Sequence, residues 1–225
     1  MLNQLPINKI IKGDCIEFLK NLPNNCIDLI ITDPPYGDGV AYGWNNKTIQ
    51  NNKDPLINCL ALAECYRVLR KNSTLYNFTN WKHYPFLVEF VMKYTKFKIR
   101  HLVVWKKHNF GLGWAFRHQY ELILVLEKGK PKYNLTNFSD VQTCSHINHN
   151  KINHPHEKPV DLIMKMIEHS SKKGSLILDP FCGSGSVCMA CKKINRHYIG
   201  IDIDKKWVGV ARGRLQLNSI GGKND

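Results

Sequence analysis

Short β-rich runs alternate with longer runs of helical periodicity along most of the chain, and no other feature constrains its fold as strongly. Parallel strands need a crossover between them, usually a helix, so this alternation predicts a mostly parallel sheet covered by helices. The predicted strands cover 8–12, 26–32, 73–78, 99–105, 120–126, 175–178 and 198–203. The predicted helices cover 55–70, 84–94, 159–170, 186–193 and 205–217. No helix separates 99–105 from 120–126, which predicts an antiparallel pair with a long connection.

The chain carries a large excess of positive charge. Its 32 Lys and Arg residues against 18 Asp and Glu give a formal net charge of +14. This excess favours a polyanion as partner, although a basic protein with no such partner stays open as an alternative. The first residues lack a signal pattern, and no apolar run reaches the ~18 residues of a membrane span. We therefore expect a soluble, cytoplasmic protein of one domain over 1–225, with no membrane partner and with reduced cysteines.

One predicted strand runs into the sequence IITDPPYG at 30–37, where a carboxylate, two prolines and a tyrosine follow in succession. Proline cannot continue a central sheet ladder, and each proline restricts its own backbone and that of the preceding residue. The motif therefore predicts a stiff turn at a strand end that holds an acid and an aromatic ring together.

A second strand runs into LILDPFCGSGSV at 176–187, a strand, an acid and a glycine-rich turn that opens a helix. Gly183 and Gly185 allow a tight turn and close approach of a ligand, although a purely structural turn stays open. The motif lacks the Lys-Ser/Thr of a phosphate-binding loop. Asp202 ends another strand roughly 20 residues after Asp179, the spacing of a ribose-binding acid, with a solvated loop acid as the alternative. Together these features indicate a nucleoside-bearing cofactor without a pyrophosphate.

The order of these motifs resembles the beta class of amino-directed DNA methyltransferases, which use S-adenosylmethionine. The resemblance rests on DPPY at 33–36 and DPFCGSGS at 179–186, with KGDC at 12–15 and HPHEKPVDLI at 154–163. The blocks VWKK, GLGW and FRHQYELIL between 104 and 124 resemble the family's middle part. The resemblance implies a Rossmann-like methyltransferase fold with a mostly parallel seven-stranded sheet, an antiparallel final strand and a circularly permuted motif order. Ligands of such folds bind at the carboxyl ends of the strands.

The resemblance also implies roles for the DPPY residues. Asp33 and the carbonyl of Pro34 would accept the N–H groups of the target amine, and Pro34 and Pro35 would fix both acceptors in advance. Tyr36 would stack on the target base, which must leave the duplex to be reached. In this family an acid at the first position goes mostly with adenine N6, whereas serine is more frequent in cytosine-N4 enzymes.

The implied cofactor site draws on several loops. Asp179 would lie near the methionine part, Asp14 and Cys15 near the adenine, and Lys158 near the carboxylate. Asp202 stands where the family usually has Glu for the ribose hydroxyls. The complete set of expected cofactor-binding residues is Asp14, Cys15, Asp33, Lys158, Asp179, Phe181, Cys182, Gly183, Ser184, Gly185 and Asp202.

Two long irregular stretches and two smaller features complete the picture. The stretch 37–53 is either a mobile loop that closes on DNA or a disordered loop, and the stretch at about 128–154, with Lys128, is expected as a small target-recognition insertion. Arg117 and Glu121, four residues apart, are expected at most to form an ion pair. No metal site is predicted, because one cysteine and four histidines lack matched ligand spacing. Those five residues are Cys144, His146, His149, His154 and His156.

The sequence thus predicts a methyltransferase that acts on adenine N6 in double-stranded DNA. Cytosine-N4 methylation on the same scaffold is the nearest alternative, and a catalytically silent DNA-binding subunit is another. RNA or protein-amide methylation is disfavoured, because in the related enzymes the cofactor loop usually comes first in the chain. A homodimer, a cognate restriction endonuclease and the target site are left open by the sequence.

Overall fold

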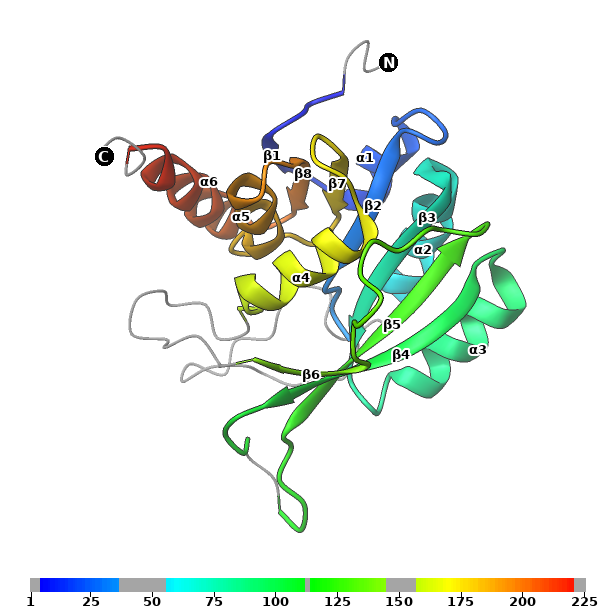
Figure 1. Cartoon of the computed structure of the whole chain (residues 1–225). Coiled ribbons are helices and arrows are strands. Elements are labelled where there is room, and N and C mark those ends of the chain that lie inside the picture. Colours follow the sequence, from blue (N-terminus) through cyan, green and yellow to red (C-terminus); the bar gives the residue numbers. More distant parts are fainter. Residues whose placement is uncertain (1–4, 37–55, 112–113, 145–156, 221–225) are drawn as a thin grey trace.

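A computed structural model describes residues 5–36, 56–111, 114–144 and 157–220, with side chains up to residue 217 (Figure 1). Its strands form one sheet in the order β1-β8-β7-β2-β3-β5-β4-β6. The strands are β1 (Lys9–Lys12), β2 (Ile27–Thr32), β3 (Leu69–Thr79), β4 (Lys98–Lys107), β5 (Tyr120–Lys128), β6 (Val141–Cys144), β7 (Leu176–Asp179) and β8 (His197–Asp202). The helices are α1 (Cys15–Lys20), α2 (Leu56–Val68), α3 (Tyr84–Tyr94), α4 (Val160–Ser170), α5 (Ser186–Lys193) and α6 (Lys205–Ile220).

The sheet is mostly parallel, as the sequence predicts. Strands β1, β8, β7, β2 and β3 run parallel to their neighbours in this group. Strand β5 is antiparallel to both β3 and β4, which confirms the antiparallel pair expected at 99–105 and 120–126. The described part of the sheet has eight strands rather than seven, because β6 adds to the outer edge of β4 in a parallel register.

Two short elements were not expected from the sequence. Strand β6 spans four residues inside the stretch 128–154, which was expected to be irregular. Helix α1 spans six residues and begins at an Asp14 side chain that accepts hydrogen bonds from the N–H groups of Ile16 and Glu17, at 2.8 and 3.2 Å. The Asp14-x-x-Glu17 spacing is a recognisable helix-start signal. Both elements are too short to show periodicity.

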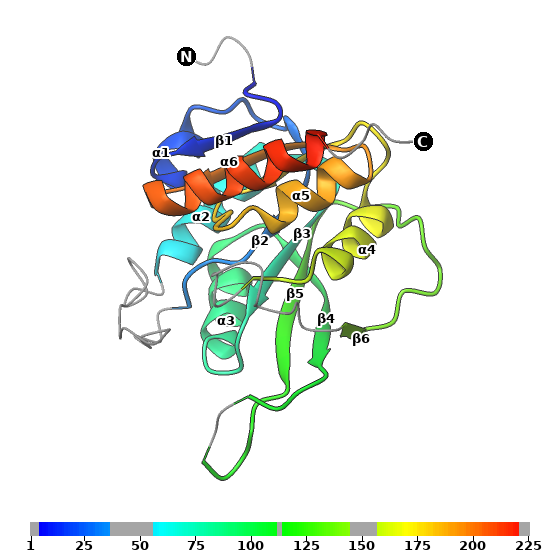
Figure 2. The ribbon, with the colours of Figure 1, turned by 90° about the vertical axis from the view of Figure 1, so that its left-hand side faces the viewer.

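Helices cover both faces of the sheet, so the fold has three layers. One core cluster joins β-strand side chains to α4, α5 and α6, and the other joins them to α1, α2 and α3. Figure 2 shows α4, α5 and α6 in front of the sheet. Adjacent residues of β2 face opposite clusters, with Ile30 in the second and Ile31 in the first, and both are fully buried. Within the described ranges, no helix combines the length and the apolar character that a bilayer crossing needs.

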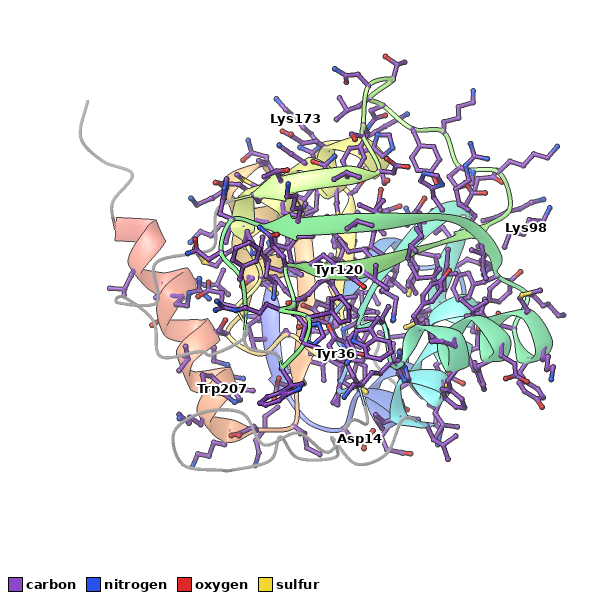
Figure 3. All side chains as sticks on the ribbon, turned by 90° about the horizontal axis from the view of Figure 1, so that it is seen from below. Asp14, Tyr36, Lys98, Tyr120, Lys173 and Trp207 are labelled. Atoms are coloured by element: carbon purple, nitrogen blue, oxygen red, sulfur yellow. The ribbon has the colours of Figure 1, made fainter. Side chains whose placement is uncertain are left out.

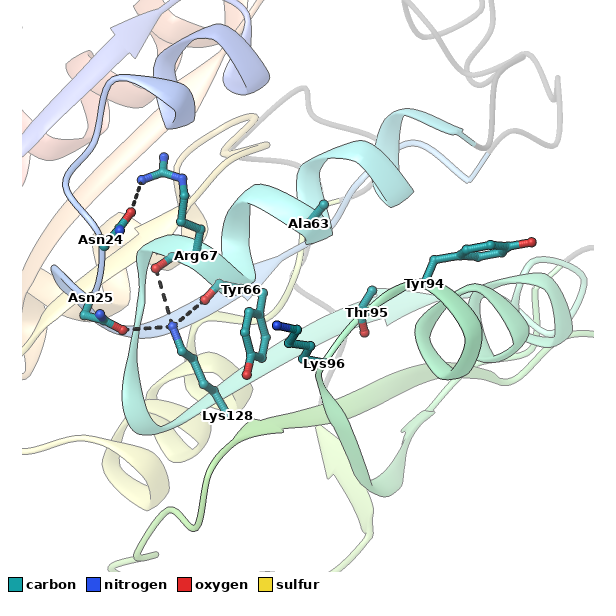
Figure 4. A pocket seen from close by; sticks show the side chains of 9 residues that line it. All are labelled: Asn24, Asn25, Ala63, Tyr66, Arg67, Tyr94, Thr95, Lys96 and Lys128. Carbon is teal, nitrogen blue, oxygen red and sulfur yellow. Dashed lines mark hydrogen bonds between the residues drawn. The ribbon is translucent and has the colours of Figure 1, made fainter.

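At the amino ends of the central strands, two basic side chains, Lys128 and Arg67, donate hydrogen bonds to the carbonyls at helix ends. At the carboxyl end of α2, the Nζ of Lys128 donates to the carbonyl of Tyr66 at 2.6 Å (Figure 4). It also donates to the carbonyl of Leu69 at 2.6 Å. Arg67 donates to the carbonyls of Leu19 and Leu22 at the end of α1. Both side chains line a cavity of about 350 Å³. Lys128, which was expected to contact DNA, is therefore used by the fold at this edge.

Candidate active site

Four aspartates lie in a row at the opposite edge of the sheet. Strands β1, β8, β7 and β2 are consecutive neighbours and run parallel, so their carboxyl ends meet at one edge. Asp14 closely follows β1, Asp202 ends β8, Asp179 ends β7, and Asp33 directly follows β2. Because neighbouring strands are about 4.8 Å apart, the four acids follow one another at short intervals. Asp14 and Tyr36 are labelled in Figure 3, which views the molecule from below.

Asp179 is the most buried acid of the row that the sequence singled out, with an exposed fraction of 4%. Burial raises the pKa of its carboxyl well above the usual value, and the N–H of Phe181, which donates to Oδ1 at 3.1 Å, offsets only part of this shift. The charges of Asp33 and Asp202 raise the pKa further. A cationic ligand group beside Asp179 would relieve this unfavourable burial.

The glycine-rich turn after Asp179 needs glycine at two positions. Gly183 and Gly185 have φ values of +48° and +84°, which residues with a Cβ rarely adopt. A Cβ at Gly185 would also lie 2.9 Å from the Cβ of Ala211 in α6. The turn therefore brings its backbone closer to α6 than a side chain would permit.

Asp202 holds the glycine-rich turn as well as ending its strand. Its Oδ2 accepts from the N–H of Gly183 at 2.8 Å, and its Oδ1 accepts from the N–H of Asp204 at 2.8 Å. Burial is the largest cause of the raised pKa of Asp202, while these two hydrogen bonds act in the opposite direction. Each carboxylate oxygen keeps acceptor capacity, so Asp202 can still bind a hydroxyl donor.

A buried polar network lies beneath the turn, and sequence reasoning did not predict it. Glu157, 4% exposed, forms an ion pair with Arg214 of α6. Arg214 also donates to the carbonyl and the hydroxyl of Ser184, at 2.7 and 3.0 Å. Ser186 donates to Glu157 at 3.4 Å. Ser184 and Ser186 therefore connect the turn to this buried ion pair. Glu157 stood inside the quoted HPHEKPVDLI block, but nothing in the sequence indicated Arg214.

The carboxylate of Asp33 is held at both oxygens. The Tyr36 hydroxyl donates to Oδ1 at 2.5 Å, and the Nζ of Lys158 lies 2.7 Å from Oδ2. Lys158 also lies 3.1 Å from Oε2 of Glu121, whose Oε1 lies 2.6 Å from the Nζ of Lys107. Glu121 thus pairs with two lysines, whereas Arg117, its expected partner, donates to the carbonyl of Gly111. The four charges form an alternating chain from β4 to the DPPY turn.

The charges of this chain stabilise one another. Burial alone would lower the pKa of Lys158, but the charges of Asp33 and Glu121 outweigh burial and raise it. Burial alone would raise the pKa of Glu121, but Lys158 and Lys107 bring it down to about 2. Lys158 and Glu121 are therefore both ionised at neutral pH.

The remaining predicted residues lie at the same edge. Pro34 is buried, and Tyr36 stacks on His83 with ring centroids 6.5 Å apart at an interplanar angle of 26°. Cys15 and Cys182 are buried thiols, and burial raises the pKa of Cys15 to about 12, so both thiols are neutral. Phe181 is half-buried beside them. His83, the N-cap residue just before α3, was not predicted from the sequence.

Two expectations fall wholly or partly outside the residues that the structure describes. The stretch 37–53 lies outside them, and so do the four histidines of the weighed metal set. Cys144, the fifth residue of that set, ends β6. In the described ranges, no three His, Cys, Asp or Glu residues form a group that could hold a metal ion.

The four carboxylates of the row determine which kind of nucleoside ligand fits this edge of the sheet. Four carboxylates repel phosphate groups, but they accept hydrogen bonds from hydroxyls and attract ammonium or sulfonium groups. Gly183 of the glycine-rich turn is partly exposed at the same edge. The row therefore fits a nucleoside joined to a cationic amino acid better than a dinucleotide.

Comparison with known proteins agrees with a ligand of this kind. A family model described as DNA methylase, for enzymes that methylate N6 or N4, matches residues 27–212. The chain belongs to the N6/N4 DNA methylase family. Among its curated relatives is the type II methyltransferase M.HpaI of Haemophilus parainfluenzae, 34% identical over 95% of this chain and 76% of that protein. The enzyme is thus a DNA amino-methyltransferase, and the cofactor of its family is S-adenosylmethionine.

Solved structures show the same fold. The complex of M1.HpyAVI with S-adenosylmethionine has a TM-score of 0.73 at 23% identity, over 92% of this chain and 98% of that one. The PvuII DNA methyltransferase, which is cytosine-N4-specific, has a TM-score of 0.77 at 15% identity, over 92% of this chain and 85% of that one. The predicted fold class is confirmed, and the family includes both possible target bases.

Proposed function

We propose that this DNA methyltransferase transfers the methyl group of S-adenosylmethionine to the N6 amino group of adenine in double-stranded DNA. The observation that carries the proposal is the position of Asp33. It stands at the end of β2, beside the buried Asp179 of β7, and both of its oxygens are held in place by protein groups.

The acceptors of the DPPY turn address the main chemical difficulty. An exocyclic adenine amine is a weak nucleophile, because its lone pair is delocalised into the ring. Asp33 and the carbonyl of Pro34 accept hydrogen bonds from the two N–H groups of the amine and draw the nitrogen toward tetrahedral geometry. A carboxylate has about four acceptor positions, so Asp33 has capacity beyond Tyr36 and Lys158. Acceptors fixed in advance need no reorganisation at the moment of reaction.

The carboxylate row would bind the cofactor along the sheet edge. Asp202 would hold the ribose hydroxyls, Asp179 the methionine part, and Asp14 and Cys15 the adenine. The bound cofactor supplies an electrophilic sulfonium methyl group. The turn at 181–185, held by Arg214 and Glu157 from behind, gives the cofactor a fixed backbone surface.

The same edge offers a surface suited to DNA. The connection between β4 and β5 leaves the sheet where β3 ends, and it carries the exposed aromatic residues Phe110, Trp114 and Phe116 next to Arg117. Basic and aromatic side chains together bind phosphates and unstacked bases. Tyr36 would stack on the extruded adenine. The net charge of +14 supports a polyanionic substrate.

The choice of adenine rests on Asp33, since an acid at this position goes mostly with adenine in this class. Cytosine-N4 methylation is the second candidate, and the fold of the PvuII enzyme accommodates it. A cognate restriction endonuclease is part of the proposal, because M.HpaI is named as a type II methyltransferase.

The test is to incubate the protein with unmethylated duplex DNA and methyl-labelled S-adenosylmethionine, digest the DNA and identify the labelled nucleoside. We expect label in N6-methyladenine, its loss in Asp33→Ala, and its retention in Glu89→Ala, which removes a 60% exposed acid on α3. Label in N4-methylcytosine would overturn the base assignment alone. A cofactor-binding protein that labels no DNA would overturn the proposed substrate.

A further inference from the structure

The charge chain behind Asp33 contains a glutamate to which no role in the reaction is assigned. Glu121 of β5 stands between two ammonium groups, 3.1 Å from Lys158 and 2.6 Å from Lys107. Its side chain is 17% exposed, and that of Lys158 is 9% exposed. Lys158 itself lies between Glu121 and Asp33, so the glutamate acts on Asp33 only through this lysine.

Stability alone does not explain this arrangement. Buried ion pairs often contribute less to folding than apolar residues of similar volume would. The neighbouring positions of β5 show that the strand accepts apolar residues here, because Leu122 and Ile123 are buried. An acid at position 121 therefore fits a role in fixing charge better than a role in folding.

The geometry also shows what Lys158 would do without Glu121. Its Nζ lies 5.4 Å from the centroid of the Phe78 ring, and Asp33 and Glu121 are the carboxylates within ion-pair distance of it among the described residues. Asp179 of β7 interacts with Lys158 at longer range. With Glu121 neutral, the ammonium would lose one of the two carboxylates that hold it in place.

We propose that Glu121 is a positioning residue for methyl transfer, which holds the Lys158 ammonium against Asp33 and thereby fixes the carboxylate that accepts the target amine. This inference rests on the proposed function of Asp33. In this inference Lys158 orients Asp33 and does not bind the cofactor carboxylate. Lys107 pairs with the second carboxylate oxygen of Glu121.

The first test compares Glu121→Gln with Glu127→Gln. Glu127 is a matched control on the same strand, since it pairs with Arg100 at 3.6 Å but lies at the other end of β5, away from the site. We expect Glu121→Gln to lower kcat by roughly 10- to 100-fold, the usual scale for a reacting group displaced by a fraction of an ångström to an ångström. The Kd for S-adenosylmethionine should stay within about 2-fold of the wild type. Glu127→Gln should change neither quantity.

The pH profile separates positioning from a general loss of structure. The groups that face Lys158 are Asp33, Glu121 and, farther away, Asp179, and the charges of Asp33 and Glu121 raise the pKa of the lysine. Removing the charge of Glu121 lowers the pH at which Lys158 loses its proton. The alkaline fall in activity should therefore shift to lower pH in Glu121→Gln and not in Glu127→Gln.

A double variant decides whether Glu121 acts through Lys158. Lys158→Met alone and Lys158→Met with Glu121→Gln should have the same kcat, because the glutamate has nothing left to position. If the losses of kcat in the two single variants multiply in the double variant, the inference is overturned. It is also overturned if Glu121→Gln has the kcat and the alkaline pH profile of the wild type. The proposed function stands in both cases. If the wild type methylates no DNA, the proposed function fails, and an NMR titration of the Lys158 ammonium decides the inference. An unchanged titration in Glu121→Gln would then overturn it.

Discussion

Replacing Gly185 by Ala should destabilise the protein more than the same change at Gly174, although both glycines have nearly the same backbone conformation. Their φ values are +84° and +79°. An added Cβ at 185 would lie 2.9 Å from the Cβ of Ala211, whereas one at 174 would meet nothing within 4 Å. The left-handed φ costs an L-residue roughly 1–2 kcal/mol in both variants. Overpacking against α6 adds about 1–3 kcal/mol at 185 alone.

We therefore expect the free energy of unfolding to fall by about 1–2 kcal/mol in Gly174→Ala and by about 2–5 kcal/mol in Gly185→Ala. Urea unfolding followed by circular dichroism measures both values, and unchanged m-values would show that the denatured states are comparable. Only Gly185→Ala should also weaken binding of S-adenosylmethionine, because only that residue lies in the glycine-rich turn.

Equal losses in the two variants would refute this reasoning, because they would show that α6 moves away at no cost. Ala211→Gly gives a second check. On its own it should cost about 1 kcal/mol, the helix propensity difference. Combined with Gly185→Ala it should restore most of the overpacking energy, which appears as a favourable coupling in the double-mutant cycle.

Two further predictions concern charged residues at opposite edges of the sheet. Lys128→Met should lower the free energy of unfolding by about 1–3 kcal/mol, because the carbonyls at the end of α2 lose their donor. It should leave DNA binding and kcat unchanged, and a loss of DNA affinity would show that Lys128 contacts DNA as well. Asp179→Asn should stabilise the cofactor-free protein by about 1 kcal/mol at neutral pH and abolish cofactor binding. Because burial raises the pKa of Asp179, ionisation of this carboxyl destabilises the folded state at pH values above the ordinary pKa of an aspartate. The stability gained in Asp179→Asn should therefore vanish below about pH 3.9. Urea unfolding measured at a series of pH values from acid to neutral would detect this change.

The parts of the fold that could be predicted are those with local signals. The strands that end in Asp33 and Asp179 were found because an apolar run stops at an acid and a proline, and α3 and α5 were located with their observed bounds. Strand β6 could not be found, because four residues with alternating burial give too short a pattern. Its strand character comes from pairing with β4, which is a tertiary effect.

The residues of the candidate site also divide into those with a local sequence signal and those without one. DPPY and the glycine-rich turn were visible because each motif is contiguous in the chain. The groups that hold them were not visible, because Glu157 is separated from Arg214, and Glu121 from Lys158, by long stretches of sequence. A single sequence does not show which lysine meets which acid. Of these four residues, only Arg214 stood outside a motif that had been noticed, since Glu121 lies in the FRHQYELIL block and Glu157 and Lys158 lie in HPHEKPVDLI.

The alignment of the two motifs depends on a residue far from the chemistry. DPPY occurs early in the chain and the glycine-rich turn late, but β2 pairs with β7, with Leu29 opposite Ile177. A slip of one residue would displace Asp33 from Asp179 by about 3.3 Å and exchange the buried faces of β2. At the amino end of β2, Oδ2 of Asp28 accepts from the N–H of Leu176 at 2.7 Å, while Arg70 holds the same carboxylate. Asp28 therefore supports the register that brings Asp33 beside the glycine-rich turn.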